Sequence, residues 1–108
     1  MLVRFPFADL AAAKKRPALV LTRTARSSRY RLVTLAMITS QVEALTLDGD
    51  VLLKDWKPAR LLHPSLLRLA KVVTVDGELV EKRIGRLSAA DYATARDVFR
   101  RVFSAWIR

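Results

Sequence analysis

The sequence predicts a mainly β fold, a small and strongly bent barrel of five or six strands with one helix at its C-terminal end. Short apolar runs separated by turn residues predict the strands, and only the last run has helical periodicity. The chain has 108 residues, the length of one domain, and 52% of them are hydrophobic. We therefore expect a single domain over residues 1–108, built around one core.

The predicted strands are rich in Val, Leu, Ile and Thr, which suit a pleated, half-buried surface. Proline stands within or beside the first two runs, where it limits how far each strand extends. The expected strands are residues 3–7, 18–22, 30–39, 51–53, 66–75 and 81–85.

Two short segments predict turns. Asp48-Gly49-Asp50 precedes a short strand, and Asp76-Gly77 matches the two-residue turn of a hairpin, because Asp and Gly both tolerate positive φ. Loops or irregular structure are expected at the basic segment 11–16, the Arg- and Ser-rich segment 24–29, and segment 56–64 with its prolines.

One helix is predicted, beginning after Ser88. Ser88 is a good N-cap, and the charge of Asp91 three residues later suits the helix N-terminus. The apolar residues that follow fall on one helical face, which we interpret as core or dimer packing. That face contains Tyr92, Ala95, Phe99, Val102, Phe103 and Trp106.

Positive charge is concentrated at the start of the chain. The sequence has 20 Lys and Arg against 10 Asp and Glu, a net charge of +10, and residues 1–31 account for +7 of it. Such an uneven distribution predicts a basic face. Nucleic acid is the most common partner of a basic face, an acidic protein is the second, and a solvated surface is the remaining alternative.

Composition excludes several kinds of protein. Without cysteine, the chain can form neither a disulfide framework nor a thiolate zinc site. His63 is the only histidine and lacks partners for a metal, so we interpret it as a structural or solvated residue and expect no metal and no cofactor. No window approaches the roughly 20 apolar residues of a membrane span, and the first residues do not form a signal peptide. We expect a cytoplasmic protein.

Three segments, in order along the chain, resemble the PemK/MazF family of toxins. The segment VRFPFADLAAAKKRPALVL (residues 3–21) is similar to that family's opening strand, basic loop and Arg-Pro strand. MITSQ (residues 37–41) resembles its Ile-Thr-Ser motif, and EKRIGRLS (residues 81–88) resembles its closing strand before the last helix. The resemblance implies an SH3-like barrel of the PemK/CcdB type, usually a homodimer. It also implies metal-free cleavage of single-stranded RNA, often mRNA, and inhibition by a labile antitoxin.

The resemblance also implies functional residues. Arg16 corresponds to the arginine of the Arg-Pro motif, and Thr39 and Ser40 correspond to the Thr-Ser pair. Arg68, in SLLRLAKV, corresponds to a strand arginine that acts as a proton donor or phosphate clamp. Two residues further on, many members have an aspartate as a candidate general base, and this chain has Ala70.

These residue types suit the implied chemistry. Attack of a ribose 2′-OH on the adjacent phosphorus needs a proton acceptor, a group that stabilises the oxyanion, and a proton donor for the leaving oxygen. Arg16 and Arg68 suit the oxyanion, because a guanidinium binds phosphate through paired donors, and Thr39 and Ser40 can add hydroxyl hydrogen bonds. Simpler roles remain open: a solvated charge for Arg16, turn formation for Thr39 and Ser40, and an outward-facing position for Arg68. The predicted substrate-binding residues are Lys14, Lys15, Pro17, Gln41 and Lys71.

The leading hypothesis is therefore a metal-independent endoribonuclease toxin that acts on single-stranded RNA. One alternative is a toxin on the same fold that poisons DNA gyrase through a C-terminal tryptophan, here Trp106, as CcdB does. Another is an RNA- or antitoxin-binding module that has lost catalysis, which Ala70 favours. The expected protein partners are a second copy of the chain and an antitoxin with an acidic, disordered segment.

Overall fold

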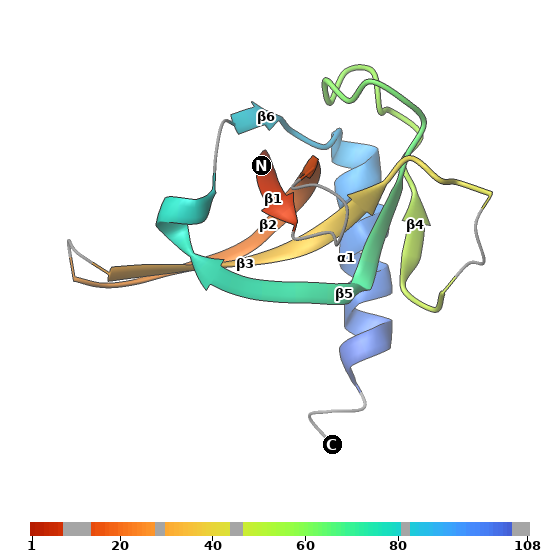
Figure 1. Ribbon diagram of the computed structural model, residues 1–108. Coiled ribbons are helices and arrows are strands. Elements are labelled where there is room, and N and C mark those ends of the chain that lie inside the picture. Colours follow the sequence, from red (N-terminus) through yellow and green to blue (C-terminus); the bar gives the residue numbers. More distant parts are fainter. Residues whose placement is uncertain (8–13, 28–29, 44–46, 81–82, 105–108) are drawn as a thin grey trace.

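One bent antiparallel sheet and a C-terminal helix make up the fold of the computed structural model, which describes residues 1–7, 14–27, 30–43, 47–80 and 83–104 (Figure 1). The predicted class, mainly β with a C-terminal helix, is confirmed. The elements are β1 (Leu2–Phe7), β2 (Lys14–Ser27), β3 (Tyr30–Thr39), β4 (Asp50–Leu52), β5 (Leu66–Asp76), the 3-10 helix η1 (Gly77–Leu79), β6 (Arg83–Gly85) and α1 (Ala89–Phe103).

The sheet has the strand order β4-β5-β3-β2-β1-β6, and every neighbouring pair is antiparallel. Register shifts interrupt the pairing of β2 with β3 between Val20 and Thr22, and that of β3 with β5 between Ala36 and Met37. Such irregularities bend a strand and increase its twist, in agreement with the curved sheet in Figure 1. The sheet remains open, with the short strands β4 and β6 at its two edges.

Apolar side chains cover both faces of the sheet. Adjacent strand residues alternate between two core clusters: Leu2 belongs to the larger and Val3 to the smaller, as do Ala36 and Leu35. This alternation follows from the two-residue period of a strand. The larger cluster includes Leu67 and Leu69 of β5, both fully buried, and Ala95 of α1 packs against it.

The start of α1 is tied to the segment after β4. The Ser88 hydroxyl accepts the backbone N–H of Asp91 at 3.1 Å, so the predicted N-cap is confirmed. Asp91 is only 3% exposed, and its carboxylate accepts the N–H groups of Lys54 at 3.1 Å and Asp55 at 2.8 Å. A buried carboxylate that receives charge-assisted hydrogen bonds fixes the helix end against the sheet edge.

The predicted apolar face of α1 is only partly buried. Ala95 is 5% exposed and packs in the core, whereas Tyr92 is 57% exposed and Phe99 is 38% exposed. Of the two predicted roles, core packing is therefore wrong for these two rings, because α1 faces the sheet through Asp91, Ala95 and Val98. Dimer packing of the two rings stays a prediction. Trp106 lies outside the described residues.

Strand β2 is longer than predicted at both ends. Lys14, Lys15 and Arg16 were assigned to a loop, but they pair with Phe7, Pro6 and Phe5 of β1. Thr24, Ala25 and Ser27, also assigned to a loop, pair with β3. In both cases the neighbouring strand supplies backbone hydrogen bonds that local composition does not reveal. Residues 11–13 and 28–29 of the two predicted loops lie outside the described residues.

The Asp76-Gly77 hairpin turn was also wrongly predicted. β5 continues to Asp76, whose carboxylate caps η1 by accepting the N–H of Glu78 at 3.0 Å. By contrast, Gly49 has a positive φ of 101° in the turn predicted before β4.

Segment 56–64 has no regular strand or helix, as predicted. Within the described part of the chain, no helix has the length and hydropathy needed to cross a membrane.

Candidate active site

A basic pocket of about 510 Å³ opens where β1, β2 and the end of β3 meet segment 60–65 and β6. Its wall is partly apolar, since Ile38 and Leu61 reach it from the larger core cluster. Its polar and charged lining residues are Arg4, Arg16, Ser40, Gln41, Arg60, His63 and Ser65.

The pairing of β1 with β2 supplies the first wall of the basic pocket. Arg4 lies opposite Pro17 and Phe5 opposite Arg16, so the antiparallel register brings the two arginines to adjacent positions on neighbouring strands. Arg16 and Pro17 were predicted site residues, and both line the pocket. Sequence reasoning missed Arg4, because the second strand was predicted to begin at residue 18 and so did not include the Arg16 and Pro17 that lie beside Arg4.

The end of β3 supplies the second wall. The Thr39 hydroxyl accepts the backbone N–H of Gln41 at 3.1 Å, and the Ser40 carbonyl accepts that of Val42 at 3.0 Å. These bonds turn the chain, so that Ser40 and Gln41 line the basic pocket. Thr39 is not among the lining residues that the structure describes and acts as a turn former.

Segment 56–65 supplies the third wall, with Arg60 and His63. Arg60 has a φ of 71°, an uncommon conformation for a residue with a side chain, and its N–H bonds to the Lys57 carbonyl at 2.9 Å. A positive φ at such a residue costs energy and is found preferentially at functional sites. Nothing in the sequence indicated Arg60, and His63 had been interpreted as a structural or solvated residue.

The basic pocket has a positive potential. Three arginines line it, and no acidic side chain of the described residues does. Guanidinium groups bind phosphate oxygens through paired donors, and a hollow that focuses one sign of charge raises the local concentration of an anionic ligand. In the described part of the chain, no three His, Asp or Glu side chains are grouped so that they could hold a metal ion.

Arg68 is not among the residues that line the basic pocket. It stands between Leu67 and Leu69, which are fully buried in the larger cluster, and strand alternation directs it to the other face of the sheet. Its side chain is 12% exposed, and its Nη2 lies 3.8 Å from Oδ2 of Asp50, whose side chain is fully buried. The structure therefore does not bring Arg68 into the basic pocket with Arg16, and it does not leave Arg68 on an open surface either.

The remaining predicted residues are spread over β2 and β5. Lys71 and Ala70 are exposed on β5, and neither is among the described residues that line the basic pocket. The backbone of Lys14 and Lys15 continues β2 beyond Arg16, next to the pocket, while their side chains lie outside what the structure describes.

The chain is similar to known toxins along nearly its whole length. A family model described as "PemK-like, MazF-like toxin of type II toxin-antitoxin system" matches residues 1–103. No curated protein sequence matches the chain.

Three solved structures share the fold. The toxin MazF-mt6 of Mycobacterium tuberculosis has a TM-score of 0.71 at 23% identity, with 96% of this chain and 97% of that chain covered. An Mtb toxin has a TM-score of 0.71 at 24% identity, covering 95% and 100%. An endoribonuclease in complex with its cognate antitoxin, from a mycobacterial species, has a TM-score of 0.70 at 14% identity, covering 95% and 90%.

Proposed function

Since the chain belongs to the PemK-like, MazF-like toxin family of type II toxin–antitoxin systems, we propose that it is a metal-independent endoribonuclease. It would cut single-stranded RNA in the cytoplasm, as a homodimer, until an antitoxin inhibits it. The observation that carries this proposal is the basic pocket. Arg4, Arg16 and Arg60 line it together with Ser40 and His63, and no carboxylate is among the described residues that line it. A structure with the same fold, that of a mycobacterial endoribonuclease in complex with its cognate antitoxin, supports both the activity and the partner.

Arg16 is the central residue of the proposed site. It is half-buried, so water screens its charge less than that of the exposed Arg4 and Arg60. As the 2′-oxygen attacks, the phosphate passes from one negative charge to two, and a guanidinium binds the second state more strongly than the first. That difference in binding accelerates cleavage, and the Ser40 hydroxyl can add a hydrogen bond to the same oxygens.

His63 is the best candidate for proton transfer, because it is the one ordinary acid–base side chain among the described residues of the pocket wall. In this proposal the neutral imidazole accepts the 2′-OH proton as the new O–P bond forms. The 5′-oxygen leaves as the P–O bond breaks and takes a proton from water, and the imidazolium returns its proton to the resulting hydroxide. The products are a 2′,3′-cyclic phosphate and a 5′-hydroxyl.

The roles first expected for Thr39 and Arg68 change with their positions. Thr39 holds the turn that presents Ser40 and Gln41, so it is a positioning residue. Arg68 is better explained as the partner of the buried Asp50 carboxylate.

Incubation of the protein with a long RNA in EDTA tests the proposal. We expect cleavage that leaves 2′,3′-cyclic phosphate ends, and a loss of roughly 10²-fold in rate for Arg16→Gln. Arg100→Gln is the matched control, since Arg100 is exposed on α1 and is not among the residues that line the pocket. RNA that stays intact with the wild-type protein, or Arg16→Gln that cleaves at the wild-type rate, would contradict it.

A further inference from the structure

Leu62 is an apolar residue that the fold leaves in water at the basic pocket. It is 75% exposed, more than any other large hydrophobic residue that the structure describes, and it lines the pocket. A single exposed leucine is common and needs no function of its own. Two features distinguish Leu62 from such a residue: its backbone is held in place, and its surroundings are charged.

The backbone of Leu62 is anchored on both sides. Leu61, directly before it, is buried in the larger core cluster. Ser65 is also buried, and its hydroxyl donates to the His63 carbonyl at 2.8 Å. Between these anchors, the ring of Pro64 fixes the φ angle. The chain between the two buried residues therefore forms a short, fixed projection that presents Leu62 instead of letting it collapse onto the core.

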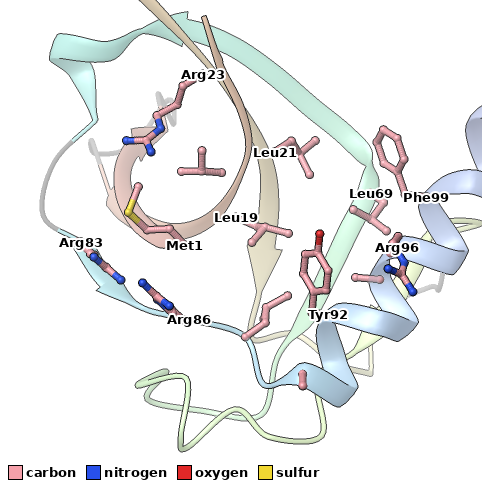
Figure 2. A pocket seen from close by; sticks show the side chains of 14 residues that line it. Met1, Leu19, Leu21, Arg23, Leu69, Arg83, Arg86, Tyr92, Arg96 and Phe99 are labelled. Atoms are coloured by element: carbon pink, nitrogen blue, oxygen red, sulfur yellow. The ribbon is translucent and has the colours of Figure 1, made fainter.

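The surroundings of Leu62 suit a nucleic acid. Three arginines line the same pocket and can bind phosphates, and of the apolar side chains that line it, only Leu62 is exposed within the described part of the chain. No Phe, Tyr or Trp is among its described lining residues. The exposed rings of Tyr92 and Phe99 line a separate cavity of about 710 Å³ beside α1, which shares no described lining residue with the basic pocket (Figure 2). Leu62 is therefore the apolar surface that the pocket offers to the face of a nucleobase.

The proposed cleavage restricts the conformation of the RNA. The 2′-oxygen, the phosphorus and the leaving 5′-oxygen must come close to a straight line before the new bond forms. When the two bases that flank the phosphate are stacked on each other, the ribose holds its 2′-oxygen to the side of that line. The cleaved step must therefore be unstacked, and contact with the protein has to offset the cost of separating the bases.

We propose that Leu62 is an unstacking wedge. Its side chain would enter between the two bases that flank the scissile phosphate, as apolar side chains enter base steps in other nucleic-acid complexes, while Arg16 binds that phosphate. His63 is the next residue, so one projection would carry both the wedge and the proton acceptor. This role rests on the proposed function and defines its substrate more closely, as single-stranded RNA with a step whose bases can separate.

The fluorescence of 2-aminopurine tests the wedge directly, because stacking on a neighbouring base quenches it. The probes are short single-stranded RNAs in which 2-aminopurine replaces one base at a time, with a 2′-deoxynucleotide at the cleaved position so that they bind uncut. We expect the wild-type chain to raise the fluorescence of the probe whose label adjoins the scissile phosphate. Leu62→Ala should bind that probe with a much smaller rise. Leu62→Phe should restore the rise, since a large apolar side chain again separates the bases.

Single-turnover cleavage provides a second measurement. Leu62→Ala should slow cleavage by about tenfold or more, the effect of losing one base contact. RNA affinity should fall less than the rate, because the energy of this contact is used to separate the bases. An RNA with an abasic ribose on the 3′ side of the scissile phosphate has no stack to break, so the difference in rate between Leu62→Ala and wild type should narrow.

Leu52→Ala is the matched control. Leu52 is an exposed leucine of β4 that does not line the basic pocket, so its loss should leave the fluorescence rise and the cleavage rate unchanged. Circular dichroism melts verify that every variant is folded.

Three results would overturn the wedge. One is cleavage by the wild-type chain without a rise in fluorescence at any labelled position. Another is a Leu62→Ala variant that raises the fluorescence and cleaves as the wild type does. The third is dissociation of a dimer by Leu62→Ala in sedimentation experiments, which would make Leu62 a contact between copies. A rise that depends on Leu62, in RNA that the chain binds but never cleaves, would sink the proposed endoribonuclease and leave the wedge standing.

Discussion

Gly85 lies so close to Ala59 that no side chain fits between them, because a Cβ atom on Gly85 would overlap the Ala59 carbonyl oxygen. Gly85 is held on β6 by its pairing with Leu2 of β1. Ala59 immediately precedes Arg60, whose positive φ turns the chain toward the basic pocket. One glycine on an edge strand thus sets the position of a pocket wall.

We expect Gly85→Ala to displace that wall. The added methyl group meets backbone rather than a movable side chain, so the change should destabilise the fold by about 1–3 kcal/mol and lower RNA cleavage beyond the loss of folded protein. Urea unfolding and the cleavage rate per folded molecule measure the two effects. Gly77→Ala is the control, since a Cβ there meets the end of the Arg31 side chain at 2.9 Å, which can move aside. Equal cleavage by both variants would contradict the proposed role of the contact.

The affinity for RNA should fall with salt concentration to a degree set by the three arginines of the basic pocket. If Arg4, Arg16 and Arg60 each neutralise one phosphate, the logarithm of affinity should fall with the logarithm of salt at a slope of about −2. Arg4→Gln should reduce this slope by about 0.7. Titrations of a short single-stranded RNA at several salt concentrations provide the values. A slope near zero would leave no role for the three arginines as phosphate ligands.

His63→Gln should separate catalysis from binding. Glutamine retains hydrogen-bonding capacity but cannot take a proton, so we expect cleavage to slow by about 10²–10⁴-fold while RNA affinity changes little. Single-turnover cleavage and anisotropy report the two quantities. His63 is exposed, so the substitution should not affect folding. A variant that cleaves at the normal rate would assign proton transfer to another group.

Arg68 and Asp50 should behave as a structural pair. Removal of the guanidinium in Arg68→Met leaves a fully buried carboxylate without its charge partner, and we expect a loss of about 3–5 kcal/mol in the free energy of unfolding. The double variant Asp50→Asn with Arg68→Met should recover much of the lost stability.

Arg68→Lys should slow cleavage far less than Arg16→Lys. An equal loss of cleavage rate in the two lysine variants would indicate that Arg68 is a catalytic residue after all.

Residue type and spacing predicted those features of the fold that depend only on residues near one another in the sequence. The N-cap Ser88, the turn at Gly49 and most strand positions follow from residue type and spacing, and they are present in the structure. The length of β2 was not predictable in this way, because Lys14 and Lys15 are strand residues only through their pairing with β1.

The candidate site shows the same division. Arg16, Ser40 and Gln41 lie on or beside strands whose motifs could be recognised, and they line one pocket. Arg60 and His63 belong to a segment without periodicity, and its contact with β6 and the burial of Ala59 and Leu61 fix where they lie. The burial of Arg68 depends on Asp50, a neighbour on another strand that no local pattern identifies.

The edges of the open sheet have a consequence for colloidal stability. Unpaired N–H and C=O groups along an edge strand are the template on which another chain can add, and repeated addition leads to amyloid-like stacking. Here both edge strands, β4 and β6, have three residues, roughly 10 Å of backbone each. Register shifts and curvature further prevent the long central strands from presenting a flat ribbon. Since β4 pairs with only Leu66–Arg68 of β5, the rest of that strand relies on its curvature, and not on an edge strand, to resist the addition of another chain.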